Sequence, residues 1–249
     1  MIFNDFTLSG YQELLNSAKD NGYLFTSFEN INNHNGFSCL LRHDIDADIK
    51  AALNIAQIEF DLGISSTFFF MTRSSVYNIF SIVNSEMVKD IVKLKHNIGL
   101  HFDASYVSNN KLTLNESVEI DVKFLEQQFN IKINTVSFHQ PSKGILSNEV
   151  KIEKFINTYD KKYFKNIHYI SDSNKVWKQE HPITLFKKKM YSKIQLLIHP
   201  MWWNTKQDNL STSDVWDAVL IDNITRTQDF LHATEGAYPS PKGMGLHKQ

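Results

Sequence analysis

Hydrophobic and polar residues follow two alternating patterns along this chain. Segments with apolar residues at helical spacing are separated by short apolar runs of strand length, and this succession repeats several times. Asn-Gly at 21–22 and Gly63 stand where two of the helical segments should end. The pattern predicts helices at 7–23, 47–63, 79–96, 115–129 and within 211–234, and strands at 37–45, 64–72, 97–103, 133–139, 167–171 and 194–199.

Strands that alternate with helices of this length pair in parallel, with helices on both faces of the sheet. No Gly-x-Gly-x-x-Gly follows the first strand, so a barrel fits better than an open dinucleotide-binding sheet. No repeat or Pro/Gly-rich linker divides the chain. We therefore predict one α/β domain over 1–249, with a helical lead-in at 1–36 and a flexible tail at 236–249. In the helix at 47–63, one apolar face should carry Ile49, Leu53, Ala56 and Phe60.

Composition narrows the class of protein. Hydrophobic residues make up 42% and charged residues 21%, which is usual for a globular protein. The net charge of -1 gives no excess of positive charge that would favour nucleic acid binding. Cys39 is the only cysteine, which excludes an intrachain disulfide and a thiolate metal site; we expect it in the core. The first 23 residues are polar and amphipathic, unlike a secretory signal or a membrane span. We therefore expect a cytoplasmic protein with no membrane span, whose oligomeric state the sequence does not indicate.

Candidate chemistry lies at the strand ends, which read "RHDID", "GLHFD", "SFHQP", "YISDS" and "LLIHP". Reactive groups of a barrel sit at these carboxyl ends. Residues two apart on a strand face the same way, so Arg42, Asp44 and Asp46 should share one face. A carboxylate at a buried strand end is costly unless it is paired or bound to metal. The alternative is helix capping, which suits Asp48 but does not account for Asp44 and Asp46 together.

Three histidines also stand at strand ends: His101, His139 and His199. Each alone could be a core histidine bonded to a carbonyl. Together with the aspartates, they form the mixed nitrogen and oxygen donor set that zinc takes in catalytic sites. The other histidines in loops and polar helix ends are expected at the surface: His34, His96, His181, His232 and His247.

Asp172 and Trp177 lie in "YISDSNKVW", and Trp202 and Trp203 follow His199 in "MWW". They could be a turn former and packed aromatics. Aromatics beside polar strand ends also suit a sugar, whose apolar ring face stacks on them. The chain has neither a Gly-x-Ser-x-Gly elbow nor a phosphate-binding glycine loop, which argues against covalent serine hydrolysis and nucleotide chemistry.

In their order and spacing, these motifs resemble the polysaccharide deacetylase superfamily, the NodB-homology fold, and most closely its His-Asp-Val-Asp branch. The resemblance covers roughly 200 residues, from "TLSGYQELL" to "IHPMWW". It implies an irregular (β/α) barrel of about seven parallel strands. By "RHDID" it implies Asp44 as the base and Asp46 as a metal ligand. By "IGLHFD" it implies His101 as a ligand, and by "LLIH" it implies His199 as the general acid.

The chain departs from the family pattern at two positions. The second metal-binding histidine, four residues after the first, is replaced by Ser105, and the arginine of "SFHQP" by His139. We expect His139 to supply the missing ligand, so that Asp46, His101 and His139 hold one divalent metal, with zinc as the first candidate.

The resemblance implies a metal-dependent carbohydrate N-deacetylase. Asp44, kept ionised by Arg42, would accept a proton from water, and His199, oriented by Asp172, would protonate the leaving amine. Trp177, Trp202 and Trp203 would contact a small-molecule or glycan substrate. That substrate would be an N-acetylated precursor of a surface polysaccharide. The alternatives are hydrolysis of another C–N amide bond, and a non-catalytic glycan-binding relic of the fold.

Overall fold

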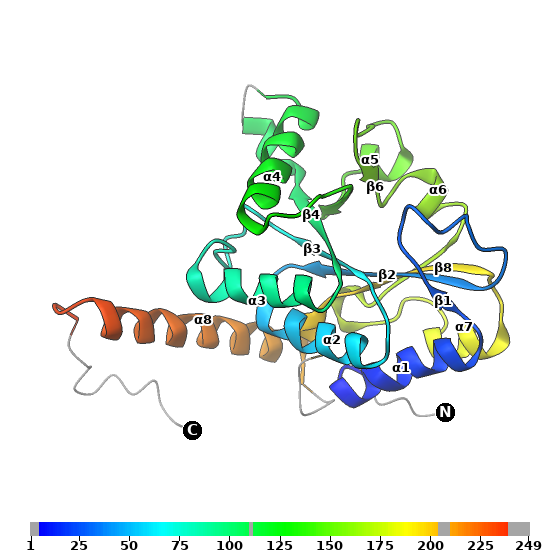
Figure 1. Cartoon of the computed structure of the whole chain (residues 1–249), viewed down its shortest axis with the longest axis horizontal. Coiled ribbons are helices and arrows are strands. Elements are labelled where there is room, and N and C mark those ends of the chain that lie inside the picture. Colours follow the sequence, from blue (N-terminus) through cyan, green and yellow to red (C-terminus); the bar gives the residue numbers. More distant parts are fainter. Residues whose placement is uncertain (1–4, 110–111, 204–209, 239–249) are drawn as a thin grey trace.

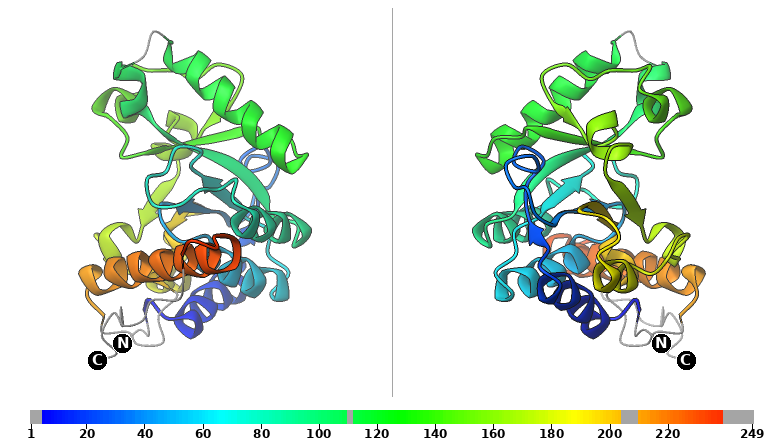
Figure 2. Two further views of the ribbon diagram at one scale, coloured as in Figure 1. Left: turned by 90° about the vertical axis from the view of Figure 1, so that its left-hand side faces the viewer. Right: turned by 90° about the vertical axis from the view of Figure 1, so that its right-hand side faces the viewer.

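One curled parallel sheet organises the molecule (Figures 1 and 2). The structure is a computed structural model that describes residues 5–109, 112–203 and 210–238. The sheet order is β6-β5-β4-β3-β2-β8-β7, and β1 pairs with β2 outside this path. The strands are β1 (Leu24–Phe25), β2 (Ser38–Ile45), β3 (Thr67–Phe70), β4 (Asn97–Asp103), β5 (Thr135–His139), β6 (Ile156–Asn157), β7 (His168–Ser171) and β8 (Lys193–Ile198).

The sheet is an irregular α/β barrel, as predicted. Seven strands follow the path, and its end strands β6 and β7 do not pair with each other within the described residues, so the barrel is open there. All six strands and all five helices expected from the hydrophobic pattern are present. β1 lies in the predicted lead-in. The predicted tail lies outside the described residues from position 239 onward.

Helices cover the sheet, and α1, α2 and α3 lie side by side along one side of it (Figure 1). The α-helices are α1 (Leu8–Asp20), α2 (Ile49–Asp61), α3 (Ile82–Lys93), α4 (Leu114–Phe129), α5 (Lys143–Ser147), α6 (Lys161–Phe164), α7 (Pro182–Lys188) and α8 (Thr212–Thr234). Short 3-10 helices are η1 (Ala104–Asn109), η2 (Ser173–Lys175) and η3 (Pro200–Trp202). The amino-terminal half of α8 buries Val215 and Val219, and the rest of the helix runs outward (Figure 1).

Asp48 lies between the end of β2 and the start of α2. The Asp48 side chain accepts a hydrogen bond from the Ala51 N–H and caps the helix, so the capping alternative holds for Asp48. The predicted apolar face of α2 was wrong at Phe60, which is 47% exposed. The buried face instead ends with Glu59.

Glu59 is buried because polar groups from other elements meet it. His43 Nε2 lies 2.6 Å from Glu59 Oε1, and the Tyr11 hydroxyl and the Ser66 hydroxyl each donate to the carboxylate at 2.5 Å. His96 Nδ1 lies 3.5 Å from Glu59 Oε2. His96 is therefore a buried residue, and its predicted surface position was wrong.

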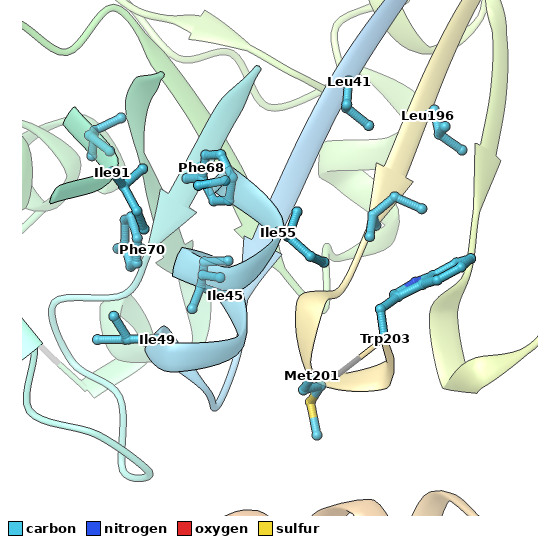
Figure 3. Packing of buried hydrophobic residues seen from close by; sticks show 14 of the residues in the cluster. Leu41, Ile45, Ile49, Ile55, Phe68, Phe70, Ile91, Leu196, Met201 and Trp203 are labelled. Atoms are coloured by element: carbon cyan, nitrogen blue, oxygen red, sulfur yellow. The ribbon is translucent and has the colours of Figure 1, made fainter. Parts of the chain in front are cut away.

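The main core lies between the sheet and the helices, with Leu41, Ile45, Phe68 and Phe70 facing Ile49 and Ile55 of α2 and Ile91 of α3 (Figure 3). Cys39 is fully buried, as expected. On the other face of the sheet, Phe69 packs in a smaller cluster with Phe28, Leu40 and Tyr163. Together the two clusters fix β2 on both faces.

Candidate active site

Arg42 and Asp44 lie on the same face of β2, and both are buried inside the barrel. Asp44 Oδ2 accepts hydrogen bonds from Arg42 Nη2 and the Ser137 hydroxyl, each at 3.1 Å. Asp44 Oδ1 has no hydrogen-bond partner among the described residues. Arg42 also donates to Gln195 Oε1 at 3.0 Å and to the Tyr159 hydroxyl at 2.9 Å. Burial would lower the pKa of Arg42, but Asp44 raises it above its ordinary value.

Asp46, His101 and His139 converge at the carboxyl ends of β2, β4 and β5. Asp46 Oδ1 lies 3.1 Å from His101 Nε2 and 3.2 Å from His139 Nδ1. Burial would raise the pKa of Asp46, but the two histidines lower it well below its usual range. The hydrogen bond to Asp46 raises the pKa of His139. Ser105, where the family pattern has a histidine, is exposed, and its backbone N–H donates to Asp103.

These three residues fit a metal ion. One donor atom from each lies within 4.8 Å of the other two. Bonds of about 2.0–2.1 Å in a tetrahedral zinc site place ligand atoms about 3.4 Å apart. The observed separations of 3.1 and 3.2 Å around Asp46 are close to that value. Two nitrogens and one carboxylate oxygen form a donor set that leaves a position open for water or substrate.

His199 and Asp172 meet where β8 and β7 end. His199 Nδ1 lies 2.6 Å from Asp172 Oδ1, and its backbone N–H also donates to this carboxylate. Its other ring nitrogen, Nε2, lies 3.9 Å from Asp46 Oδ2. Burial would lower the pKa of His199, but Asp172 raises it to about 9. The pair therefore sits beside the three candidate metal ligands.

A cavity of about 490 Å³ connects these groups. Its lining includes Asp44, Asp46, His101, His139 and His199, and Trp202 lies on its wall. The rest of the apolar and aromatic lining is Phe138, Pro141, Leu146, Tyr159, Phe164, Tyr169, Ile170, Leu197 and Trp216. Further polar side chains also line the cavity: Gln140, Ser171, Ser173, Asn174, Lys178 and Gln179. Polar and charged side chains make up about half of this lining, which suits a polar ligand more than an apolar one.

The structure separates the three tryptophans that the sequence suggested for substrate contact. Trp202 lines the cavity. Trp203 is fully buried, and its indole N–H donates to Asp172 Oδ2 at 2.7 Å. Trp177 donates to Asp5 and stacks on Phe6, away from the cavity lining. The expectation of substrate contact is therefore kept for Trp202 and dropped for the other two, because neither reaches the cavity wall.

Sequence reasoning missed several residues of the site. Gln195, Tyr159 and Ser137 fix Arg42 and Asp44, yet they come from β8, a loop and β5. Ser137 could have been found, because it lies two residues before His139 on the same strand and so shares its face. Gln195, a polar residue within an apolar strand, was a second available signal.

Comparison with known proteins gave matches only among solved structures. No protein-family model matches the sequence, and no curated protein matches it. A family 4 carbohydrate esterase from Bacillus anthracis is 13% identical, with 86% of each chain covered and a TM-score of 0.45. A polysaccharide deacetylase from Bacillus cereus is 16% identical, with 84% of this chain and 60% of that chain covered and a TM-score of 0.44.

A third structure, a CE4 family pseudoenzyme from Bacillus anthracis, is 14% identical, with 79% of this chain and 62% of that chain covered and a TM-score of 0.41. This chain thus spans about three fifths of the length of the last two proteins. A likeness of fold at this level does not establish an activity. Among the described residues, no helix has the length and apolar character that a membrane crossing requires.

Proposed function

We propose that this chain is a metal-dependent hydrolase of the polysaccharide deacetylase superfamily that removes an acetyl group from an N-acetylated sugar. One observation carries the proposal: a candidate base, three candidate metal ligands and a histidine–aspartate pair line or adjoin one cavity. They come from the ends of five strands of one sheet, β2, β4, β5, β7 and β8, whose sequence motifs follow the family order. The same groups in separate places would support only structural roles.

Asp46, His101 and His139 would hold the divalent ion, with zinc as the first candidate because of the mixed nitrogen and oxygen donors. When bound, such an ion polarises an acyl carbonyl and lowers the pKa of a water from near 16 towards about 7. The remaining steps belong to residues of the chain itself.

Asp44 is the candidate general base. Arg42 and Ser137 occupy its Oδ2 and fix the orientation of the carboxylate. Its Oδ1 has no partner in the described part of the chain and is therefore available to accept a proton from water. Arg42 does not line the cavity, so its role is to position Asp44 and not to contact substrate.

His199 is the candidate general acid. The Asp172 carboxylate raises the pKa of His199 and so favours the protonated imidazolium that an acid needs. Asp172 binds the ring at Nδ1, which leaves the proton on Nε2 directed to the cavity side, near Asp46. Transfer of that proton to the departing nitrogen releases a neutral amine, while the acyl group leaves as acetate.

The cavity wall suits a sugar. Trp202, Tyr169 and Phe164 offer aromatic faces to the apolar face of a pyranose ring, and about 490 Å³ admits one or two sugar units. The finer proposal, a precursor of a surface polysaccharide, depends on the cytoplasmic location expected from the sequence. Product analysis after exposure to candidate precursors would test it.

The deciding experiment measures acetate released from N-acetylglucosamine and from its tetramer, tetra-N-acetylchitotetraose. Chelator-treated protein should be inactive, and added zinc should restore acetate release. Ammonia or a ring-opened acid in place of acetate would indicate another C–N hydrolase. Binding of the tetramer by zinc-loaded protein without any product would contradict the proposed activity and support the glycan-binding alternative.

A further inference from the structure

We infer that Trp203 is a positioning residue: its indole N–H fixes the Asp172 carboxylate, which in turn holds His199 with Nε2 turned to the cavity. The effect on turnover rests on the proposed function. The effect on His199 itself does not, because it depends only on hydrogen bonds within this chain.

The Asp172 carboxylate is fully buried and receives hydrogen bonds at both oxygens. Oδ1 binds the His199 ring at 2.6 Å, and Oδ2 binds the Trp203 indole at 2.7 Å. The His199 backbone N–H lies 3.1 Å from Oδ1 and 3.0 Å from Oδ2. The backbone N–H is shared between both oxygens. Each oxygen therefore has its own side-chain partner, the His199 ring at Oδ1 and the Trp203 indole at Oδ2.

Both side chains that bind Asp172 leave the same turn of the chain. His199 directly precedes η3 and Trp203 directly follows it. Asp172 therefore connects the two ends of this turn. Without the indole donor, Oδ2 would be a buried carboxylate oxygen held only by the shared backbone contact. Rotation of the carboxylate would then weaken its bond to the His199 ring.

Aromatic rings hold the indole of Trp203 in place. Its ring centroid lies 5.2 Å from that of Phe6, 5.4 Å from that of Tyr11 and 6.1 Å from that of Trp177. Figure 3 shows Trp203 projecting from the turn that follows β8, with its ring in the core cluster. The ring is thus positioned before any substrate arrives, and it has no exposed surface with which to bind one.

Trp202 has the opposite environment, although it is the adjacent residue. It lines the cavity, and its indole nitrogen has no hydrogen-bond partner among the described residues. The two adjacent tryptophans therefore have different roles: Trp202 faces the cavity, and Trp203 faces Asp172, the partner of His199.

The test replaces Trp203 by phenylalanine, and also by β-(3-benzothienyl)alanine introduced at this position alone. The second variant keeps the two-ring shape but has sulfur where indole has N–H, so it remains informative if Trp203→Phe does not fold. The first readout is the proton NMR signal of the His199 Nδ1–H, far downfield of the amides and identified by its loss in His199→Gln. We expect this signal to move upfield or broaden in both Trp203 variants.

Tyr23→Phe is the control, because it also removes one hydrogen-bond donor of a buried aromatic ring, to the Tyr191 carbonyl, and its ring packs on Phe37 and Phe186 instead of Trp203. It should leave the His199 signal unchanged. With tetra-N-acetylchitotetraose as the probe, Trp203→Phe should lower kcat by about 10-fold to 100-fold with little change in KM. Trp202→Phe should instead raise KM and leave the His199 signal in place.

An unchanged His199 signal in the benzothienyl variant would overturn the inference, whether or not the protein is a deacetylase. An equal change in Tyr23→Phe would also overturn it, since the effect would then come from general packing. If wild-type protein releases no acetate, the proposed function fails, and the NMR comparison still decides the role of Trp203.

Discussion

Asp44 and Asp46 are two residues apart and have different partners, which suggests different roles. Asp44 lies deep in the barrel, bonded to Arg42 and Ser137. Asp46 lies between the rings of His101 and His139. The guanidinium of Arg42 balances the negative charge of Asp44, so Asp44 can be ionised without a metal. Asp46 instead faces two imidazoles, which is the arrangement of a metal ligand. Substitutions at the two positions should therefore have different effects.

For the ligand set, we expect Asp46→Ala, His101→Ala and His139→Ala each to lose bound zinc after dialysis against low zinc. Each removes one of only three protein ligands and thereby part of the binding free energy. Ser105→Ala should keep its metal, because Ser105 is exposed and does not line the cavity. Elemental analysis of the purified variants provides the measurement. Full zinc content in His139→Ala would show that this histidine is not a ligand.

For the acid and the base, we expect Asp44→Asn and His199→Gln to keep their zinc but to lose turnover. Each change removes one proton-transfer group at nearly constant shape, which typically lowers kcat by about 10² to 10⁴. Acetate release and metal content, measured on the same preparations, separate catalysis from binding. Loss of zinc in His199→Gln would mean that this histidine is a ligand and not the acid.

The residues at the strand ends could be predicted because their positions follow from local spacing. Two aspartates at β2 and histidines at β4, β5 and β8 must meet if the strands are parallel neighbours. The role of Trp203 could not be predicted in this way. The indole N–H of Trp203 reaches Asp172, 31 positions earlier, and only the tertiary packing shows which of two adjacent tryptophans faces the cavity.

At the scale of elements, α2 shows where periodicity is insufficient. Glu59 and Phe60 are adjacent, and hydropathy alone favours burial of Phe60. The structure buries Glu59, because His43, Tyr11 and Ser66 supply partners from other elements. A charged residue can occupy a core position when such partners are present, and a helix read in isolation does not reveal them.

The packing of β4 against β3 yields a prediction about Gly99. A Cβ at this position would lie 2.4 Å from two ring carbons of Phe69 and 3.0 Å from the Thr135 carbonyl oxygen. Phe69 is fully buried and cannot move aside freely. Gly99→Ala should therefore lower the free energy of unfolding by about 1–3 kcal/mol, as overpacked cores do.

Urea unfolding measures this loss, with Gly236→Ala as the control, since nothing lies within 4 Å of a Cβ there. Adding Phe69→Leu to Gly99→Ala should recover part of the stability if the clash is with the ring. Equal stability of Gly99→Ala and wild type would mean that the two strands can separate slightly at no cost.

At the scale of the whole molecule, the site and the buried Glu59 cluster lie on opposite faces of β2. Asp44 faces the inside of the barrel, and His43 faces α2. The order of the strands, with β2 between β3 and β8, could be expected from the barrel fold. The two-residue strands β1 and β6 and the short helices α5 and α6 could not be expected. Such short segments do not show a hydrophobic period in the sequence.

This second face of β2 should determine how stability depends on pH. Burial alone would raise the pKa of Glu59, but His43, His96 and the Ser66 hydroxyl lower it below its ordinary value. Burial lowers the pKa of His96. A group whose pKa is depressed on folding binds its proton more readily in the unfolded chain, so both groups destabilise the fold as pH falls. The loss should begin below about pH 6.5 through His96, and continue below about pH 4.3 through Glu59.

Urea unfolding of chelator-treated protein across this range should show both steps. Glu59→Gln should be less stable at pH 7 by about 3 kcal/mol, because it leaves the buried cluster without its carboxylate. Its stability should then fall less steeply than that of wild type below about pH 4.3, where only wild type has this carboxylate to protonate. The exposed Glu13→Gln serves as the control and should follow the wild-type curve. If Glu59→Gln and wild type lost stability in parallel at low pH, the depressed pKa of Glu59 would not contribute to folding, and the acid sensitivity would have to come from other groups.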